Sequence, residues 1–193
     1  IGKFGKILEL IHCKKCKKVL FAGNISKPKI SSLKLDLKGI FYMPRIIKAS
    51  KLGDAAVLKE LIKILDENRI RVLKLNFFNP ELTLQKGNYS KLKPNNYEKL
   101  EIVKGVNYLS KLNAHNHTQG IILRKGMVIA KETAKGTKKM IQSISKIKEP
   151  NGMLIKFPKK KQDLRVDLPT IGLDTLKDCK MVGIKGIILK SNE

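Results

Sequence analysis

Residues 54–75, DAAVLKELIKILDENRIRVLKL, decide the fold class, because a helix pattern here runs directly into a strand pattern. The apolar residues of the first part recur three and four positions apart, as on one face of a helix: Val57, Leu58, Leu61, Ile62 and Leu65. Asp54 is a candidate N-cap for that helix. NRIRVLKL follows as a turn and a strand rich in branched residues.

The residues before this stretch predict the same alternation. Residues 2–12 carry apolar side chains at helical spacing, and KVLFAG at 18–23 predicts a short buried strand that ends at Gly23. A short helix is expected near 33–42, with Pro44 as a break. The order helix, strand, loop, helix, strand is typical of an α/β unit with parallel strands. We therefore expect an N-terminal α/β domain over residues 1–84.

A second α/β domain is expected over 95–193, after a linker at 85–94 that is rich in Gly, Asn and Ser. A helix pattern follows the linker, and two apolar runs on either side of Lys125-Gly126 predict a β-hairpin. Further strands are expected at 152–157 and 186–190. The remaining helix signals are the apolar spacing of Ile141, Ile144 and Ile147, and Asp174 as a cap.

The composition favours an anionic partner without identifying it. The 193 residues carry a formal net charge of +25, with 36 lysines and five arginines. This charge suits nucleic acid, phosphates or an acidic membrane surface, and it also fits a solvated surface without a specific role. Aromatic residues make up only 5% and no RNA-binding signature occurs, so a specific nucleic-acid partner is not expected. Three cysteines form no disulfide framework, which favours a reducing, cytoplasmic compartment.

Three short motifs each permit a structural and a functional interpretation. Cys13 and Cys16 form a single C-x-x-C, which is a surface turn, a redox pair or an incomplete metal site. His115 and His117 lie two apart in a loop-like segment that is either solvated or metal-binding. Gly136-Thr137 precedes a helix pattern, so Thr137 is a plain N-cap or the helix start binds a phosphate.

Residues 157–172, FPKKKQDLRVDLPTIG, alternate charged and apolar side chains. On an extended chain Asp163, Arg165 and Asp167 would share one face, either as surface ion pairs or as a row that lines a cleft. Arg165 would then bind a phosphate and an aspartate would hold Mg²⁺ or activate water. Residues four apart on a straight strand are separated by roughly 13 Å. One ion could join both aspartates only if the chain bends between them.

Residues 152–176 closely resemble the C-terminal signature of the LpxI-type UDP-2,3-diacylglucosamine pyrophosphatases. The shared signature residues are Lys156, Lys159 or Lys160, Gln162, Asp163, Arg165, Asp167, Pro169, Thr170 and Gly172. TQGIILRKGMVIAKETAKGTKKMI at 118–141 resembles an upstream family motif through Gln119, Gly126, Ala130, Glu132, Gly136 and Thr137. Parts of residues 21–73 resemble the family's N-terminal domain.

This resemblance implies a partial Rossmann-like N-terminal domain and a C-terminal α/β domain, with the chain shorter than the family pattern at both ends. It implies cytoplasmic, Mg²⁺-dependent hydrolysis of UDP-2,3-diacylglucosamine at the inner membrane face, in lipid A biosynthesis. Apart from the resemblance, a homodimer is a candidate assembly. The expected catalytic residues are Asp163, Arg165 and Asp167, and the expected metal ligands are Asp163, Asp167 and Glu132. The expected substrate-binding residues are Lys156, Gln162, Gly136, Thr137, Gln119, Thr170 and Gly23.

The chain departs from the family pattern at several acids. Asn116, Lys135 and Lys138 stand where the family has acidic residues, and Ala55 replaces the second acid of a GDD motif. These replacements leave open a protein that binds a lipid-linked sugar nucleotide without cleaving it. The net charge alone leaves open a basic protein that binds nucleic acid.

Overall fold

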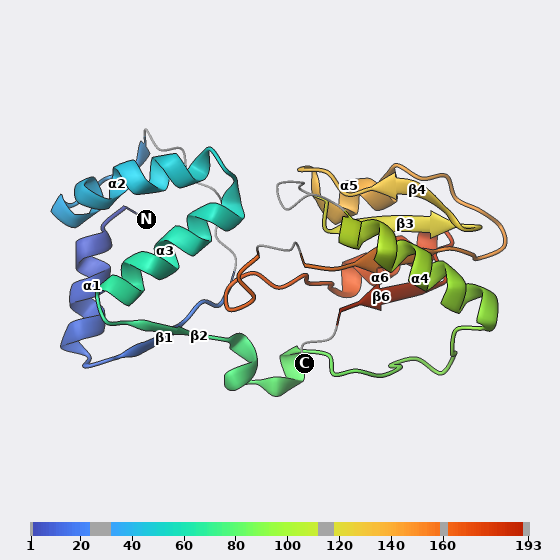
Figure 1. The fold of residues 1–193 in the computed structure, drawn as a ribbon, viewed down its shortest axis with the longest axis horizontal. Helices are drawn as coiled ribbons and strands as arrows, with labels where there is room; N and C mark the ends of the chain where they lie inside the picture. Colours follow the sequence, from blue (N-terminus) through green and yellow to red (C-terminus); the bar gives the residue numbers. More distant parts are fainter. Residues whose placement is uncertain (1, 24–31, 112–117, 159–161, 191–193) are drawn as a thin grey trace. The chain divides into compact units, whose positions relative to one another are not determined.

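The computed structural model describes residues 2–23, 32–111, 118–158 and 162–190 (Figure 1). The chain forms two compact units of mixed helices and strands, which confirms the expected α/β class. Unit 1 contains residues 1–82 together with 163–167, and unit 2 contains 83–162 and 168–193. The segment 163–167 therefore packs with the first unit although its neighbours in sequence belong to the second.

Unit 1 combines three helices with a pair of parallel strands. In chain order its elements are α1 (Phe4–Cys13), β1 (Lys18–Leu20), α2 (Leu37–Ser50), α3 (Asp54–Glu67), β2 (Arg71–Leu73) and the 3₁₀ turns η2 (Leu75–Phe77) and η3 (Pro80–Leu82). Val19 of β1 lies opposite Val72 of β2. Residues of α1, α3 and β2, with the residue just before β2, form the buried core of this unit, namely Leu8, Ile62, Leu65, Ile70 and Val72. Of the apolar stripe expected on α3, Ile62 and Leu65 are buried, and Ile64, which the stripe did not include, is buried as well.

Helix α2 is longer than expected and continues through Pro44. A proline inside a helix removes one backbone hydrogen bond and costs about 3 kcal/mol, so other contacts must hold the helix together. Asp36 caps its start, with a carboxylate oxygen 2.7 Å from the backbone nitrogen of Gly39. Ala49 is buried near its end. The prediction that the helix ends before Pro44 was wrong, because tertiary packing outweighs the local preference of proline.

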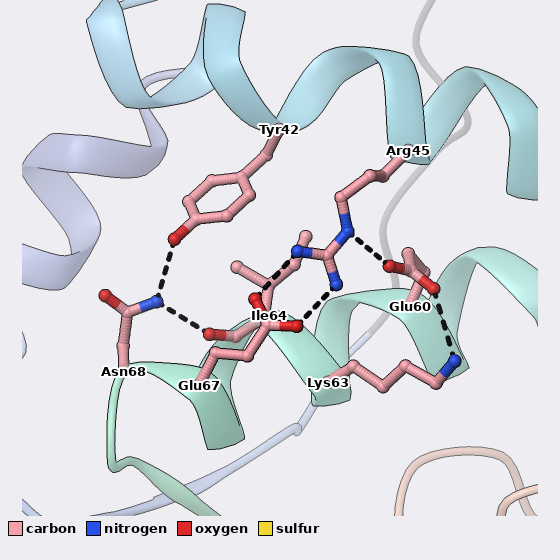
Figure 2. A network of polar contacts seen from close by, with 7 residues as sticks. All are labelled: Tyr42, Arg45, Glu60, Lys63, Ile64, Glu67 and Asn68. Carbon is pink, nitrogen blue, oxygen red and sulfur yellow. Dashed lines mark hydrogen bonds and ion pairs between the residues drawn. The ribbon is translucent and has the colours of Figure 1, made fainter.

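A polar network joins α2 to α3 (Figure 2). The Arg45 guanidinium donates two hydrogen bonds of 2.7 Å to the Glu67 carboxylate and one of 2.7 Å to Glu60. The side chain of Asn68 donates to the Tyr42 hydroxyl at 3.1 Å. Bonding to Arg45 lowers the pKa of Glu67 below its ordinary value. These contacts place one face of α2 against α3 and leave the opposite face outward.

Unit 2 is a four-stranded sheet with helices on both faces (Figure 1). Its elements are α4 (Asn96–Lys111), β3 (Gly120–Arg124), β4 (Met127–Lys131), α5 (Gly136–Gln142), β5 (Met153–Lys156), α6 (Leu173–Met181) and β6 (Gly186–Leu189). The strand order is β4-β3-β5-β6, with β5 and β6 parallel and β3 antiparallel to both of its neighbours. The hairpin expected around Lys125-Gly126 is confirmed, and both residues have the positive φ of its tight turn.

Alternate side chains of the central strands enter two separate cores. Ile122 and Leu154 pack with residues of α5 and α6, whereas Ile121 and Ile155 pack with residues of α4. Strands that are buried on both faces account for the continuous apolar runs in the sequence. Gly105 of α4 lies so close to the sheet that a Cβ there would collide with Ile155.

Several local expectations were wrong. Helix α5 ends at Gln142, so Ile144 and Ile147 follow the helix instead of lying on it. Gly53 and Gly172 are the N-caps of α3 and α6, and Asp54 and Asp174 lie in the first turns. The segment expected to be extended at 163–168 instead contains a turn at 164–166.

Candidate active site

Four segments of unit 2 meet at one edge of the sheet. Gly120 at the start of β3 lies opposite Lys156 at the end of β5, because these strands are antiparallel. Glu132 follows β4, and its backbone nitrogen bonds the Gly120 carbonyl at 2.8 Å. Thr137 is in the first turn of α5. We refer to Glu132, Thr137 and Lys156 as the Lys156 cluster.

The Lys156 cluster is a chain of hydrogen bonds between buried groups. The Lys156 ammonium donates to the Thr137 hydroxyl at 2.6 Å, and that hydroxyl donates to Oε1 of Glu132 at 2.7 Å. The ammonium also lies 3.8 Å from the same carboxylate oxygen. Only 8% of Lys156 and 7% of Glu132 are exposed. Two opposite charges are thus held out of water with a hydroxyl between them, so removing either partner would leave an uncompensated charge in the interior.

The second carboxylate oxygen of Glu132 is buried and has no hydrogen-bond partner among the described residues. Gly120 leaves room for it, since a Cβ at that position would stand 2.9 Å from this oxygen. A buried acceptor without a partner is costly, and such groups are often found where a ligand or water binds. This oxygen could accept a hydrogen bond or bind a cation.

Gln119 and Gln162 extend the site along the same edge. The Gln119 side-chain nitrogen donates to the Gln162 side-chain oxygen at 2.8 Å, and Gln162 is buried. The backbone carbonyl of Gln119 accepts from the Phe157 nitrogen at 2.8 Å, which continues the β3–β5 ladder. The Thr170 carbonyl accepts a long bond of 3.4 Å from Lys156. The structure therefore brings together six of the residues predicted in this unit, namely Gln119, Glu132, Thr137, Lys156, Gln162 and Thr170.

Thr137 does not cap α5, contrary to one of the two interpretations of the sequence. The N-cap is Lys135, which makes no side-chain cap bond, and the Thr137 hydroxyl is used by Lys156 and Glu132. Gly136 has a φ of 82°, a conformation that glycine adopts most readily. The polar role of Thr137 is thus internal to the Lys156 cluster.

In unit 1, residues 163–167 form a helical turn that we call the aspartate turn. The Asp163 carbonyl accepts from the Val166 nitrogen at 3.2 Å and from the Asp167 nitrogen at 3.0 Å. The Val166 side chain packs against the apolar core of unit 1. Alternation therefore does not continue through this segment, and Val166 ties the turn to unit 1.

Arg165 and Asp163 bind each other within the aspartate turn. The guanidinium donates to Oδ2 of Asp163 at 2.8 Å through Nη2 and to Oδ1 at 3.0 Å through Nε. The Arg165 backbone nitrogen also donates to Oδ1 at 3.0 Å. The guanidinium bonds lower the pKa of Asp163 below its ordinary value, against the effect of partial burial, and raise the pKa of Arg165.

Helix α3 supplies two further charges beside the aspartate turn. Lys59 attracts the Asp163 carboxylate and Asp66 attracts the Arg165 guanidinium. Together with the core residue Ile62, these residues recur at helical spacing and so share one side of α3. The sequence pointed to none of these partners, because they lie about 100 positions before the turn and no local motif marks them.

The chain bends at 164–166, which is the condition under which Asp163 and Asp167 could bind one ion. Asp163 and Asp167 are joined by a backbone hydrogen bond within one turn, so the roughly 13 Å spacing of a straight strand does not apply. Among the described residues no three Asp, Glu, His or Cys side chains gather as a metal site, and Glu132 belongs to the other unit. The carboxylates have suitable chemistry for Mg²⁺.

The remaining predicted residues are dispersed. Gly23 follows β1 in unit 1 with a φ of 97°. Lys135 and Lys138, which replace family acids, are exposed. Cys13 and Cys16 are exposed free thiols at the end of α1. The two histidines and Asn116 at 115–117, and the lysine pair at 159–160, lie outside the described residues.

Comparison with known proteins identifies the family of both parts of the chain. Residues 1–82 match the LpxI N-terminal domain and residues 85–193 match the LpxI C-terminal domain. UDP-2,3-diacylglucosamine pyrophosphatase LpxI of Caulobacter vibrioides is 31% identical over 196 residues, which cover 97% of this chain and 70% of that protein. The residues of the Lys156 cluster and of the aspartate turn are those that carried the resemblance in the sequence, and the chain belongs to the LpxI family.

Proposed function

We propose that the protein hydrolyses the pyrophosphate bond of UDP-2,3-diacylglucosamine to UMP and 2,3-diacylglucosamine 1-phosphate, a step of lipid A biosynthesis. Family membership in both domains supports this reaction, as does the activity for which the Caulobacter vibrioides relative is named. The observation that carries the proposal furthest is the Lys156 cluster, in which signature residues far apart in sequence meet at one sheet edge. A buried ammonium beside hydroxyl and amide groups suits a substrate that contains a diphosphate.

The proposed chemistry consumes one water. Its oxygen bonds to one phosphorus of the diphosphate, the bond from that phosphorus to the bridging oxygen breaks, and a proton is released. Negative charge builds on the phosphate oxygens as this happens, so fixed cations accelerate the reaction. We assign Lys156 to that role, with Thr137 and Glu132 holding its ammonium in place.

Arg165 is the second cation that we assign to the diphosphate. Its guanidinium is oriented by Asp163 through Nε and Nη2, which fixes a group that would otherwise rotate. The carboxylates of Asp163 and Asp167 are our candidates for orienting the water. Gln119, Gln162, Gly136, Thr170 and Gly23 are proposed to bind the substrate.

We propose Mg²⁺ as the cofactor, with Asp163, Asp167 and Glu132 as candidate ligands. When bound, the ion would neutralise charge on the diphosphate oxygens. The buried oxygen of Glu132 and the two carboxylates of the aspartate turn support this assignment by their chemistry. Calorimetric titration of the protein with MgCl₂ tests it, and Glu132→Gln should weaken binding whereas the exposed control Glu149→Gln should not.

The proposed location is the cytoplasmic face of the inner membrane. Among the described residues, no helix combines the length and apolarity needed to cross a bilayer. The substrate carries acyl chains, and the chain has a net charge of +25. A cationic protein attached to an anionic lipid surface would meet this substrate where it resides.

A second function is binding without hydrolysis. Lys135 and Lys138 place two exposed cations in α5 or at its N-cap, where the family pattern has acids. Lost carboxylates weaken metal binding and water activation, whereas added cations favour a diphosphate ligand.

Release of UMP from purified substrate in detergent, with and without Mg²⁺, separates the two functions. Hydrolysis predicts UMP release that Lys156→Met reduces by about 10²-fold and that the exposed control Lys177→Met leaves unchanged. Binding alone predicts no UMP release but a rise in melting temperature with substrate, and this result would overturn the proposed reaction.

A further inference from the structure

Helix α2 presents an apolar face to solvent. Leu37 is 86% exposed, Phe41 72% and Ile40 57%, and Ile47 is also exposed. The outward residues of the helix, with Pro44, recur at spacings of three and four and so lie on one side. Figure 2 shows Tyr42 and Arg45 on the side that meets α3. Large apolar side chains are thus gathered where this unit does not bury them.

The same face is cationic. Lys38, Lys48 and the C-cap residue Lys51 are exposed beside the apolar residues, and α2 contains no acidic residue. Asp36 lies just before the helix, where its carboxylate accepts backbone hydrogen bonds from Lys6 and Gly39. An exposed helix that is apolar along one line and flanked by lysines matches the pattern of helices that lie in a membrane interface.

We infer that the outward face of α2 docks this protein on an anionic lipid bilayer, with Leu37, Ile40, Phe41 and Ile47 entering the headgroup region. The inference deepens the peripheral membrane location proposed above by naming the surface that makes the contact. The charge of this face favours a lipid bilayer over a second copy of the chain as its partner. A second copy packed on it symmetrically would bring Lys38, Lys48 and Lys51 against the same lysines. An anionic bilayer accepts the apolar side chains and the lysines at the same time.

The absence of tryptophan from the chain provides a direct reporter. Phe41→Trp places a single indole on the outward face of α2, and Phe77→Trp places one at another exposed position of unit 1, in η2. Vesicles of phosphatidylcholine with a minority of phosphatidylglycerol should shift the indole emission of the Phe41→Trp variant to the blue and leave that of the Phe77→Trp variant unchanged. Vesicles of phosphatidylcholine alone should shift the emission of the Phe41→Trp variant much less.

Sedimentation with the same vesicles measures the affinity without any reporter. Ile40→Ser with Phe41→Ser should weaken binding by about tenfold or more, whereas Phe77→Ser with Phe78→Ser should not. Lys38→Glu with Lys48→Glu should also weaken binding by at least about tenfold. The control Lys177→Glu with Lys180→Glu makes the same change in net charge on α6 and should have a smaller effect. Circular dichroism establishes that each variant is folded.

Three results would overturn the inference. One is equal loss of vesicle binding in the α2 variants and their controls, which would indicate general attraction by the net charge. Another is a dimer in lipid-free solution that becomes a monomer when Ile40→Ser and Phe41→Ser are introduced. This result would show that a second copy of the chain covers the face. The last is a raised KM for substrate in detergent with unchanged vesicle binding, which would assign the face to the acyl chains. Vesicle binding needs no turnover, so it can fail or succeed independently of UMP release.

Discussion

The Lys156 cluster and the aspartate turn hold signature residues by different means. Strand register places the Lys156 cluster, because antiparallel pairing of β3 with β5 sets Gly120 beside Lys156 and brings Glu132 to the same edge. The aspartate turn is built from hydrogen bonds among its own residues, and it contacts unit 1 through the apolar side chain of Val166 and through charges on α3. A site fixed by a sheet should resist perturbation more than a site fixed by a few side-chain contacts.

The largest effect is expected from the aspartate turn itself. Asp163→Ala and Asp167→Ala should each reduce UMP release by about 10²-fold or more, because each removes a carboxylate proposed to act at the diphosphate. Initial rates in detergent measure this effect, and Asp174→Ala in the first turn of α6 is the matched control. Near-normal rates in both variants would remove the aspartate turn from the mechanism.

The Lys156 cluster should respond in stability as well as in rate. Lys156→Met leaves the buried Glu132 carboxylate without its cation and should lower the free energy of unfolding by about 3 kcal/mol. Adding Glu132→Gln to that variant removes the stranded charge and should recover much of the loss. Urea unfolding of the two single variants and the double variant measures the coupling. Additive losses would show that the pair does not interact.

Substitutions of Val166 and Val19, which pack on the same core, test whether that core positions the aspartate turn. Val166→Ala and Val19→Ala each remove two carbons next to the core of unit 1 and should cost about 1 kcal/mol of stability. Only Val166→Ala should also reduce UMP release, by about tenfold, since only Val166 lies in the turn. Val166→Ile keeps a branched apolar side chain at this position and should release UMP at nearly the wild-type rate. Equal rates in both alanine variants would show that the core does not position the turn.

The smallest expected effect is a pH dependence of stability. The pKa of Asp163 is lower in the folded protein than its ordinary value because Arg165 binds the ionised form. The contribution of this pair is therefore present above the unfolded pKa, near 3.8, and is lost as the pH falls through the folded pKa. Asp163→Asn should destabilise the protein at pH 6, and its difference from wild type should shrink towards pH 3. A constant difference in urea unfolding would contradict this.

The spacing of apolar residues predicted those helices and strands in which the local sequence and the tertiary packing favour the same structure. The helix at Asp54–Glu67 bears the apolar spacing of a core-facing helix, and Lys125-Gly126 suits only a tight turn between two strands. Helix α2 could not be delimited in this way, because Arg45 and Ala49 hold it together beyond a proline. That compensation depends on residues of α3 and has no local signal.

The resemblance predicted residues for the candidate site but not their arrangement. The resemblance named Glu132, Thr137 and Lys156 without showing that one hydroxyl links the other two groups. The alternation around Arg165 favoured a strand, yet Val166 packs on the core of unit 1 and the backbone closes into a turn. Contacts between distant parts of a chain decide such cases, and short-range patterns do not contain them.

The position of Val166 has a consequence for the order in which the protein is made. The core of unit 1 is otherwise complete once β2 has left the ribosome, but Val166 follows β2 by about 90 residues. At translation rates of about 5–20 residues per second, the first unit waits several seconds for its last apolar side chain. During that interval β3, β4 and β5 of unit 2 are synthesised, so unit 1 reaches its final form only after most of its neighbour exists.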